Sequence, residues 1–274
     1  MSLGSRRMRV LAGCALGVAL AGVLRTSAAA PGVPPLRVCA DPNNLPFTNT
    51  RGEGFENAVA DVLAHQLGRT VEYYWQPQRR GFLRTTLQAH RCDVVMSVPS
   101  ALERVRTTMP YYRSSYVFVS QRARHLDVRS FDDPRLATLR VGIQITGEDY
   151  ENPPAAQALA VRGLVNNVRG FPVYGDYSQP APQRTIIDAV AAGTVDIAVV
   201  WGPIAGYFVK SVPIAMRLEP VQRHDGVDAT PFAFDLSIGV RPDDAPLARE
   251  LDVALRRRAA EIRRIFDHFG IPRA

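Results

Sequence analysis

The chain has 274 residues, of which 46% are hydrophobic and 22% charged, so a disordered or fibrous protein is excluded and one or two buried cores are expected. The formal net charge is +7, but residues 1–29 contribute four arginines and no acid, which leaves +3 for the rest. That excess is too small to indicate nucleic-acid binding.

The first 29 residues have the features of a secretory signal peptide. Arg6, Arg7 and Arg9 precede the apolar segment 10–24, and small residues lead to a cleavage site expected after Ala29. The apolar segment has 15 residues, which is short for a membrane span. We therefore predict export through a cleavable signal peptide, and no integral membrane anchor.

Two cysteines, Cys39 and Cys92, remain after the signal peptide is removed. An even pair in an oxidising compartment predicts a disulfide. Two buried free thiols on neighbouring strands are the alternative, because the sequence does not show whether the two Cα atoms lie within bonding range.

Strand-like and helix-like segments alternate in the first half of the exported chain. Helices are predicted where apolar residues recur at three- and four-residue spacing, and strands where β-branched, aromatic or continuous apolar residues occur. The predicted order is strand 36–40, helix 53–68, strand 71–75, helix 81–90 and strand 92–98.

The second half repeats this alternation and ends in a long helix. Its apolar residues run from Leu247 to Phe269 before Gly270 and Pro272 end it, and we expect it to pack against the first unit. The other predicted elements are strand 140–145, helix 153–164, strand 168–174, helix 183–193 and strand 195–201.

Together these elements predict an α/β fold of two lobes, each a mixed, mainly parallel sheet flanked by helices. Segments 116–121 and 232–241 are the two crossovers. The predicted lobe 1 comprises residues 30–117 and 232–274, and the predicted lobe 2 comprises residues 118–231.

Two such lobes leave a cleft bordered by the loops at the carboxyl ends of the strands, where open α/β sheets bind ligands. The loop after the first predicted strand offers polar groups from Asp41, Asn43 and Asn44 and an apolar wall from Phe47. An ordinary turn is the alternative, because Asp, Asn and Pro are favoured in turns.

A second candidate stretch lies where the predicted strand 71–75 leads into a helix. Trp75, Arg79 and Arg80 are placed either to rim the cleft or to form a docking patch, since interfaces favour aromatic and arginine side chains. The alternative is that Trp75 and Phe82 pack in the core while the two arginines are solvated, and for Phe82 we favour the core.

Catalytic and metal-binding patterns are weak. Asp41 and Glu56 are the best acid/base pair for a lyase, but an acid in the first turn of a helix is equally explained by the helix dipole. The five histidines are scattered, no HExxH or CxxC occurs, and Ser97 and Ser100 lack a Gly-x-Ser-x-Gly elbow. We therefore predict no enzyme activity, no metal site and no cofactor.

Six segments of the exported chain occur in the order CADPNNLPF, YYWQPQRRGF, RCDVVMSVPS, TTMPYYRSSYVFV, NPPAAQALAVRG and VDIAVVWGPIAGYF. Along nearly its whole length the exported chain resembles the type II periplasmic solute-binding proteins of ABC transporters. In these six segments it resembles more narrowly the J-type accessory proteins associated with methanol and other quinoprotein dehydrogenases.

This resemblance implies a periplasmic accessory protein that binds a pyrroloquinoline quinone (PQQ)-dependent alcohol dehydrogenase and assists the maturation or activation of that enzyme, with the cytochrome of the enzyme as a further candidate partner. Any quinone or metal would then belong to the partner. Two alternatives are a transport receptor for a small solute and, with less support, a small-molecule lyase.

Departures from the amino-acid-binding members of the fold bear on the ligand. Those members pair an arginine after the third strand with the ligand carboxylate, whereas Arg104 lies nearer the Pro-Tyr-Tyr segment. Segment 140–154 lacks their Gly-Thr-Thr nest, and Trp201 stands where they place an aspartate. We therefore expect an aromatic, apolar cleft and no amino-acid ligand.

The candidate ligand or partner residues are Asp41, Asn43, Asn44, Phe47, Trp75, Arg79, Arg80, Ser97, Arg104, Tyr112, Gln144 and Trp201.

Overall fold

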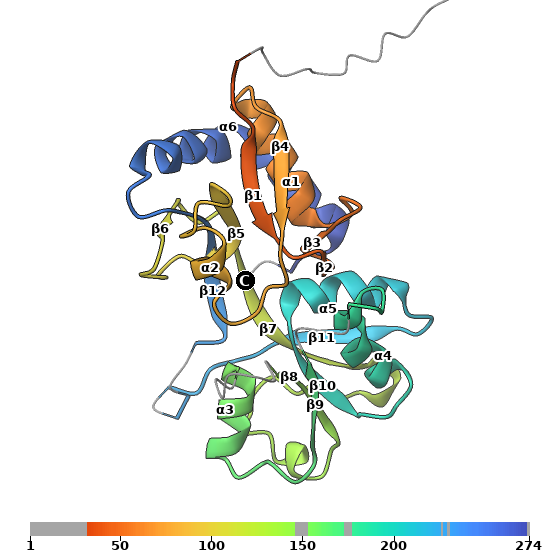
Figure 1. Ribbon diagram of the computed structural model, residues 1–274. Coiled ribbons are helices and arrows are strands. Elements are labelled where there is room, and N and C mark those ends of the chain that lie inside the picture. The colour runs from red at the N-terminus through yellow and green to blue at the C-terminus, as the bar shows by residue number, and fades with distance from the viewer. Residues whose placement is uncertain (1–31, 146–152, 173–176, 226, 229–230, 273–274) are drawn as a thin grey trace, which may run out of the picture.

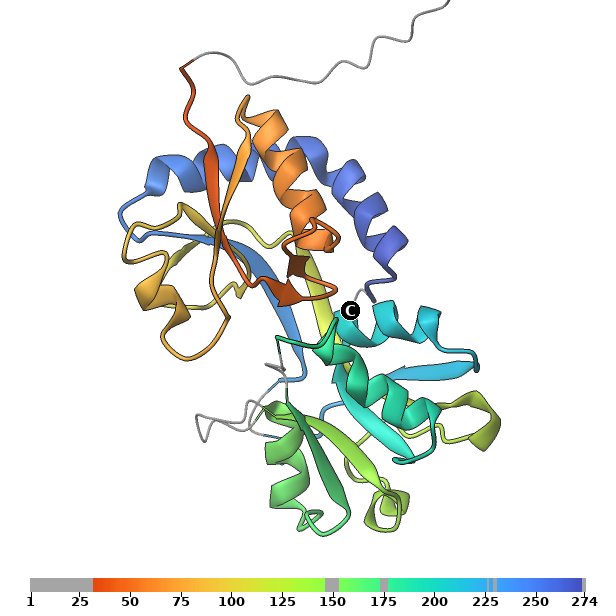
Figure 2. The same cartoon turned by 45° about the vertical axis from the view of Figure 1, so that its right-hand side comes forward.

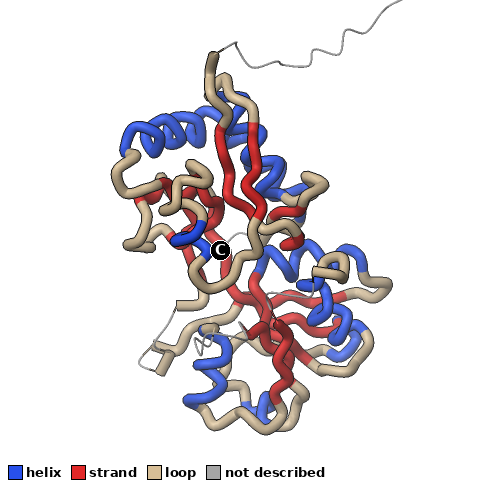
Figure 3. The backbone as a smooth tube through the Cα atoms, in the orientation of Figure 1, coloured by secondary structure: helices blue, strands red, loops and turns tan. Residues whose placement is uncertain are grey.

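Two α/β lobes, one above the other in Figure 1, are joined by the long strands β7 (Tyr112–Gln121) and β12 (Ala233–Val240). The computed structural model describes residues 32–145, 153–172, 177–225, 227–228 and 231–272. The predicted signal peptide lies outside these residues. Strands pass without a break from one lobe to the other, as Figure 3 shows.

Lobe 1 is built around a parallel group in which β1 lies between β4 and β5, so that Val38 faces Tyr73 on one side and Val94 on the other. Strand β12 continues the sheet antiparallel to β5 and then pairs with β7. The elements of this lobe are β1 (Leu36–Ala40), β2 (Asn43–Asn44), β3 (Thr48–Asn49), α1 (Phe55–Gln66), β4 (Val71–Trp75), α2 (Phe82–Thr85), β5 (Val94–Pro99), β6 (Arg106–Thr107) and α6 (Ala245–Phe269).

Lobe 2 repeats this plan, with β8 parallel to both β9 and β10, and with β7 antiparallel to β10 and β11. The sheet as a whole is therefore mixed, with a parallel group in each lobe. The elements are η1 (Arg122–Arg124), η2 (Pro134–Ala137), β8 (Val141–Ile145), α3 (Pro154–Val161), β9 (Val168–Pro172), η3 (Pro182–Arg184), α4 (Thr185–Ala191), β10 (Ile197–Trp201), α5 (Gly202–Phe208), η4 (Val209–Ser211) and β11 (Met216–Pro220), where η marks a short 3₁₀ helix.

The architecture confirms the predicted fold class of two α/β lobes with two crossing segments. The crossing strands belong to both halves of one sheet, so strand pairing alone does not mark a boundary between the lobes. We propose the boundaries given by the sequence, with residues 30–117 and 232–274 in lobe 1 and residues 118–231 in lobe 2.

Helices α1 and α6 pack together on the outside of lobe 1, as expected for the terminal helix (Figure 2). The ring of Phe55 is fully buried and lies 5.8 Å from the ring of Phe266 on α6. The Asp244 carboxylate caps α6 by accepting a hydrogen bond from the backbone of Leu247, and Gly270 ends the helix with φ +73°. Burial of each large apolar side chain contributes about 2 kcal/mol to folding.

Cys39 and Cys92 form the predicted disulfide. Their Cα atoms are 5.4 Å apart, and both residues are buried. The bridge joins β1 to the residues just before β5 and encloses a core cluster that includes Phe82 and Leu87. The alternative of two free thiols is therefore excluded.

The predicted helix over residues 81–90 is wrong in its length, because α2 spans only Phe82–Thr85. The hydroxyl of Thr86 donates to the Phe82 carbonyl at 2.6 Å, and the hydroxyl of Thr85 donates to the Gly81 carbonyl at 3.2 Å. Such side-chain bonds compete with the helical backbone bonds. The chain then leaves the helical conformation at Thr86, where φ is −117° and ψ is −84°.

None of the helices in the described part of the chain is long and apolar enough to cross a membrane.

Candidate ligand-binding cleft

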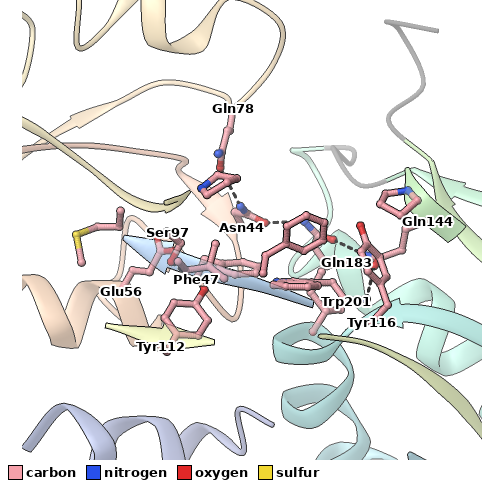
Figure 4. Close-up of a pocket in the computed structure, with 16 residues that line it drawn as sticks. Asn44, Phe47, Glu56, Gln78, Ser97, Tyr112, Tyr116, Gln144, Gln183 and Trp201 are labelled. Carbon is pink, nitrogen blue, oxygen red and sulfur yellow. Dashed lines mark hydrogen bonds between the residues drawn. The ribbon is translucent and has the colours of Figure 1, made fainter. Parts of the chain in front are cut away.

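A cavity of about 350 Å³ lies between the two lobes (Figure 4). Lobe 1 contributes the loop after β1, the start of α1 and the end of β5, and lobe 2 contributes β8, β10 and the segment before α4. The residues that line the cavity are Asn44, Phe47, Glu56, Gln78, Met96, Ser97, Pro99, Tyr112, Tyr116, Gln144, Pro154, Gln183, Trp201, Ile204, Phe234 and Leu236.

Aromatic rings form much of the apolar wall. The indole of Trp201, at the end of β10, lies 5.2 Å from the ring of Tyr116 and 6.0 Å from the ring of Phe234. From lobe 1, Phe47 packs on the buried ring of Phe55 at 5.3 Å. These four cavity-lining rings, which come from both lobes, are only partly buried, so they present faces or edges to a bound molecule.

A chain of amide side chains crosses the cavity from lobe 2 to lobe 1 (Figure 4). Gln144 accepts a hydrogen bond from the backbone of Trp201 at 2.8 Å and donates to Gln183 at 3.4 Å. Gln183 donates to the side-chain oxygen of Asn44 at 2.6 Å, and Asn44 donates to Gln78 at 3.4 Å. Most of the amide groups in the cavity are therefore committed to one another.

The loop after β1 is also fastened to lobe 2 behind the cavity wall. The buried Asp41 carboxylate accepts hydrogen bonds from the backbone of Asn43 at 2.8 Å, the backbone of Gln78 at 2.7 Å and the hydroxyl of Tyr177 at 2.7 Å. The Asn43 side chain donates to the carbonyl of Gln179 at 2.8 Å. Asp41 thus organises the loop and bridges the lobes.

Replacing Asp41 with alanine is expected to lower the free energy of unfolding by about 3 kcal/mol, because three donors lose a buried charged acceptor. Urea denaturation measures this loss. The matched control is Asp225→Ala at a carboxylate whose side chain is 91% exposed, where we expect a change of about 0.5 kcal/mol or less. An Asp41→Ala variant as stable as the unaltered protein would show that these bonds do not hold the loop.

Glu56, in the first turn of α1, is only 8% exposed and lines the cavity. Burial raises the pKa of its carboxyl to about 7, while a hydrogen bond with Ser97 acts in the opposite direction. Ser97 also bonds the hydroxyls of Tyr111 at 2.8 Å and Tyr112 at 3.0 Å. Burial raises the pKa of both tyrosines, so they are neutral at physiological pH.

Ser97 owes its position to a bulge in β5. Val98 pairs with Ser237 and Val95 pairs with Gly239, so two residues of β5 face one residue of β12. Ser97 takes up the irregularity with φ +50°, a left-handed conformation that is uncommon for a residue other than glycine. Backbone strain of this kind occurs often at binding sites.

Among the described residues that line the cavity there is a single carboxylic acid, Glu56, and no lysine or arginine. The carboxylate of an amino acid would therefore have no guanidinium partner there. No group of three or more His, Cys, Asp or Glu side chains within the described residues is arranged to hold a metal ion.

Half of the twelve candidate residues line this cavity, namely Asn44, Phe47, Ser97, Tyr112, Gln144 and Trp201. Asp41 and Asn43 lie behind its wall, in the bonds between the lobes. Trp75 does not line it and instead stacks on Tyr73, with ring centroids 4.5 Å apart, against the core of lobe 1. Phe82 is buried. Trp75 and Phe82 therefore both pack in the core, which was the alternative to a place at the cleft.

The remaining arginine candidates lie outside the cavity. Arg79 and Arg104, together with Arg84, line a neighbouring groove of about 280 Å³. None of the residues that line this groove is acidic within the described chain. Arg80, which is exposed, is adjacent to Arg79 in the sequence, and the Arg79 guanidinium lies 5.7 Å from the ring centre of Tyr177.

The sequence did not point to Gln78, Gln183, Tyr116 or Phe234 as cavity residues. A signal existed for two of them, because Gln78 follows β4 and Tyr116 lies at the crossing between the lobes, where strand ends approach the cleft. For Glu56, the sequence suggested only an interaction with the helix dipole or the acid of a lyase. The structure shows that Glu56 lines the cavity.

The fold, the interlobe cavity and the two crossing strands define a class of protein. The chain belongs to the bacterial extracellular solute-binding proteins, family 3, whose family model matches residues 36–270.

Within this class, the most informative relatives are proteins called MoxJ, MxaJ and XoxJ. Protein MoxJ of Methylorubrum extorquens is 33% identical over 253 residues, which cover 89% of this chain and 83% of that protein. The crystal structure of MxaJ from Methlophaga aminisulfidivorans MPT has a TM-score of 0.73 at 27% identity, covering 87% of this chain and all of that one. The periplasmic binding protein XoxJ from Methylobacterium extorquens AM1 has a TM-score of 0.71 at 32% identity, covering 87% and 99%.

Structures of amino-acid-binding proteins match at only 18% to 21% identity. That likeness shows the fold alone.

Proposed function

We propose that this protein is a non-catalytic periplasmic accessory protein that binds a PQQ-dependent alcohol dehydrogenase and assists its maturation or activation. The observation that carries the proposal is the similarity to MoxJ and XoxJ across nearly the whole length of each chain. The cavity supports it, because none of its described lining residues is a lysine or arginine that could pair with the carboxylate of an amino acid. The extracellular family and the predicted signal peptide support the periplasmic location.

The proposed docking surface is the arginine-rich side of lobe 1. Its four members are exposed and come from the segment after β4 and the segment after β5. Arginine side chains anchor interfaces through charge-assisted hydrogen bonds and through stacking on flat groups. The docking residues are Arg79, Arg80, Arg84 and Arg104.

Reversing two of these charges in the Arg79→Glu/Arg80→Glu variant is expected to weaken dehydrogenase binding about tenfold or more, because like charges would then meet at the interface. Surface plasmon resonance with the purified dehydrogenase measures the affinity. The matched control is Arg263→Glu/Arg264→Glu, two exposed arginines on α6. Equal affinities of the two double variants would remove the arginine surface from the proposal.

A second candidate function, a transport receptor for a small solute, is favoured by the cavity and by the bonds that link the lobes across it. Strands β7 and β12 form the connection about which two such lobes close. A lyase has less support, because the Asp41 carboxylate is occupied by three donors outside the cavity.

A further inference from the structure

We propose that the cleft binds a small organic ammonium ion that carries no carboxylate, with Glu56 as its counter-ion and the aromatic rings as its walls. This inference goes beyond dehydrogenase binding and does not depend on it. It deepens the receptor candidate by naming the chemical class of the ligand.

The charge balance of the cavity wall favours a cation. Among the described lining residues, Glu56 is the single carboxylic acid and none is a lysine or arginine. An ionised carboxylate that is 8% exposed is poorly solvated, and a mobile cation would supply the opposite charge that none of these described residues supplies. A neutral or anionic ligand would leave the carboxylate without that compensation.

The aromatic composition of the cavity wall also favours an organic cation. Trp201, Tyr116 and Phe234 form one aromatic group, and Phe47 faces the cavity from lobe 1. Alkylammonium ions are attracted to the faces of such rings, most strongly to tryptophan, and their methyl groups bury apolar surface. Glu56, Phe47 and Trp201 all line the same cavity (Figure 4), so a charged contact and aromatic contacts are offered within one site.

The cavity wall disfavours a carboxylate on the ligand. One N–H of each of the amides of Gln144, Gln183 and Asn44 already bonds a neighbouring side chain. Among the described lining residues a carboxylate would find no lysine or arginine, and Glu56 would repel it. The expected ligand is an amine or a quaternary ammonium ion and is not a zwitterion.

The titratable groups around Glu56 give the binding a predictable pH dependence. Tyr111 and Tyr112 face it from the start of β7, and Tyr73 interacts with it from β4. Burial raises the pKa of each, so all three are neutral, and the ring that α6 packs on Tyr112, Phe266, is uncharged. A bound cation favours the ionised form of Glu56, so affinity is expected to rise between pH 6 and pH 8, with proton release at the lower pH.

Isothermal titration calorimetry on the purified protein tests the proposal with choline and with its neutral isostere, in which a tert-butyl group replaces the trimethylammonium group. The two molecules have nearly the same shape and differ in charge. We expect choline to bind about tenfold or more tightly than the isostere, and glycine betaine, which adds a carboxylate, to bind about tenfold or more weakly than choline.

Two variants test the counter-ion. Glu56→Gln is expected to weaken choline binding about tenfold or more and to leave the isostere unaffected. Glu72→Gln, at an exposed glutamate on β4, is the matched control and should bind as the unaltered protein does. Circular dichroism of both variants checks that the fold is retained.

The proposal is overturned if choline and its isostere bind equally, if glycine betaine binds as tightly as choline, if Glu56→Gln keeps full choline affinity, or if neither choline nor tetramethylammonium binds at millimolar concentration. These titrations use no dehydrogenase, so their failure is separate from failure of the accessory function.

Discussion

Glu56→Gln is expected to raise the free energy of unfolding by about 3 kcal/mol at pH 8 and by only about 1 kcal/mol at pH 5. The reason is the burial that raises the pKa of this carboxyl from 4.5 to about 7 in the folded protein. Between these values the folded state holds a proton that the unfolded state releases. Stability is therefore lost as the pH rises through this window, and glutamine, which does not ionise, avoids the loss.

Urea denaturation of both proteins at the two pH values measures this difference. Glu72→Gln, with an exposed side chain, is the control and should change stability by about 0.5 kcal/mol or less at either pH. A gain for Glu56→Gln that is the same at pH 5 and pH 8 would mean that Glu56 is not a buried ionisable group.

The second large effect is expected for Gly54→Ala, which should lower the free energy of unfolding by about 3 kcal/mol. A Cβ atom at Gly54 would overlap the carbonyl of Phe47 and lie 2.7 Å from the backbone nitrogen of Thr48. These are backbone atoms, and the same loop accepts hydrogen bonds from the first residues of α1, Phe55 at 2.8 Å and Glu56 at 3.0 Å. The methyl group therefore separates α1 from the loop and displaces two cavity residues, Phe47 and Glu56.

Thermal and urea denaturation measure the loss, and Gly163→Ala is the control. Gly163 has φ +70° but open space around its Cα, so alanine there brings only the conformational penalty of about 1 kcal/mol. If the two variants lose the same stability, the close approach of α1 to the loop is not the reason that position 54 requires glycine.

The elements of the fold that were predicted are those whose residue types or apolar spacing are typical of a strand or a helix. The β-branched and aromatic run of β4 and the apolar run of β5 gave strands, and the three- and four-residue spacing of α1 gave a helix. Helix 81–90 was predicted too long, because the bonds from the hydroxyls of Thr85 and Thr86 to nearby carbonyls do not alter the hydrophobic pattern.

The candidate site was predictable only where it follows strand ends. Asn44 and Phe47 follow β1, and Trp201 ends β10, so their place near the cleft follows from the order of elements. The place of Gln183 in the cavity depends on how the two lobes face each other. The conformation of Ser97 depends on its register with β12, and the burial of Glu56 depends on the packing of α1 beneath the loop. None of these three has a signal in the neighbouring sequence.

The molecule has two candidate binding surfaces. The arginine-rich groove on lobe 1 is open to solvent and has no acidic residue among its described lining, which suits a protein partner. The interlobe cavity has one buried carboxylic acid among its described lining residues and has aromatic walls, which suits a small cation.

Native mass spectrometry tests the central proposal most directly, on protein recovered through a C-terminal tag from the periplasm of its own host during growth on an alcohol. We predict a stoichiometric complex with a quinoprotein dehydrogenase subunit, with or without a small bound cation. Recovery of the protein alone from a periplasm that contains the dehydrogenase, even when it carries a small ligand, would contradict the accessory function and favour the transport receptor.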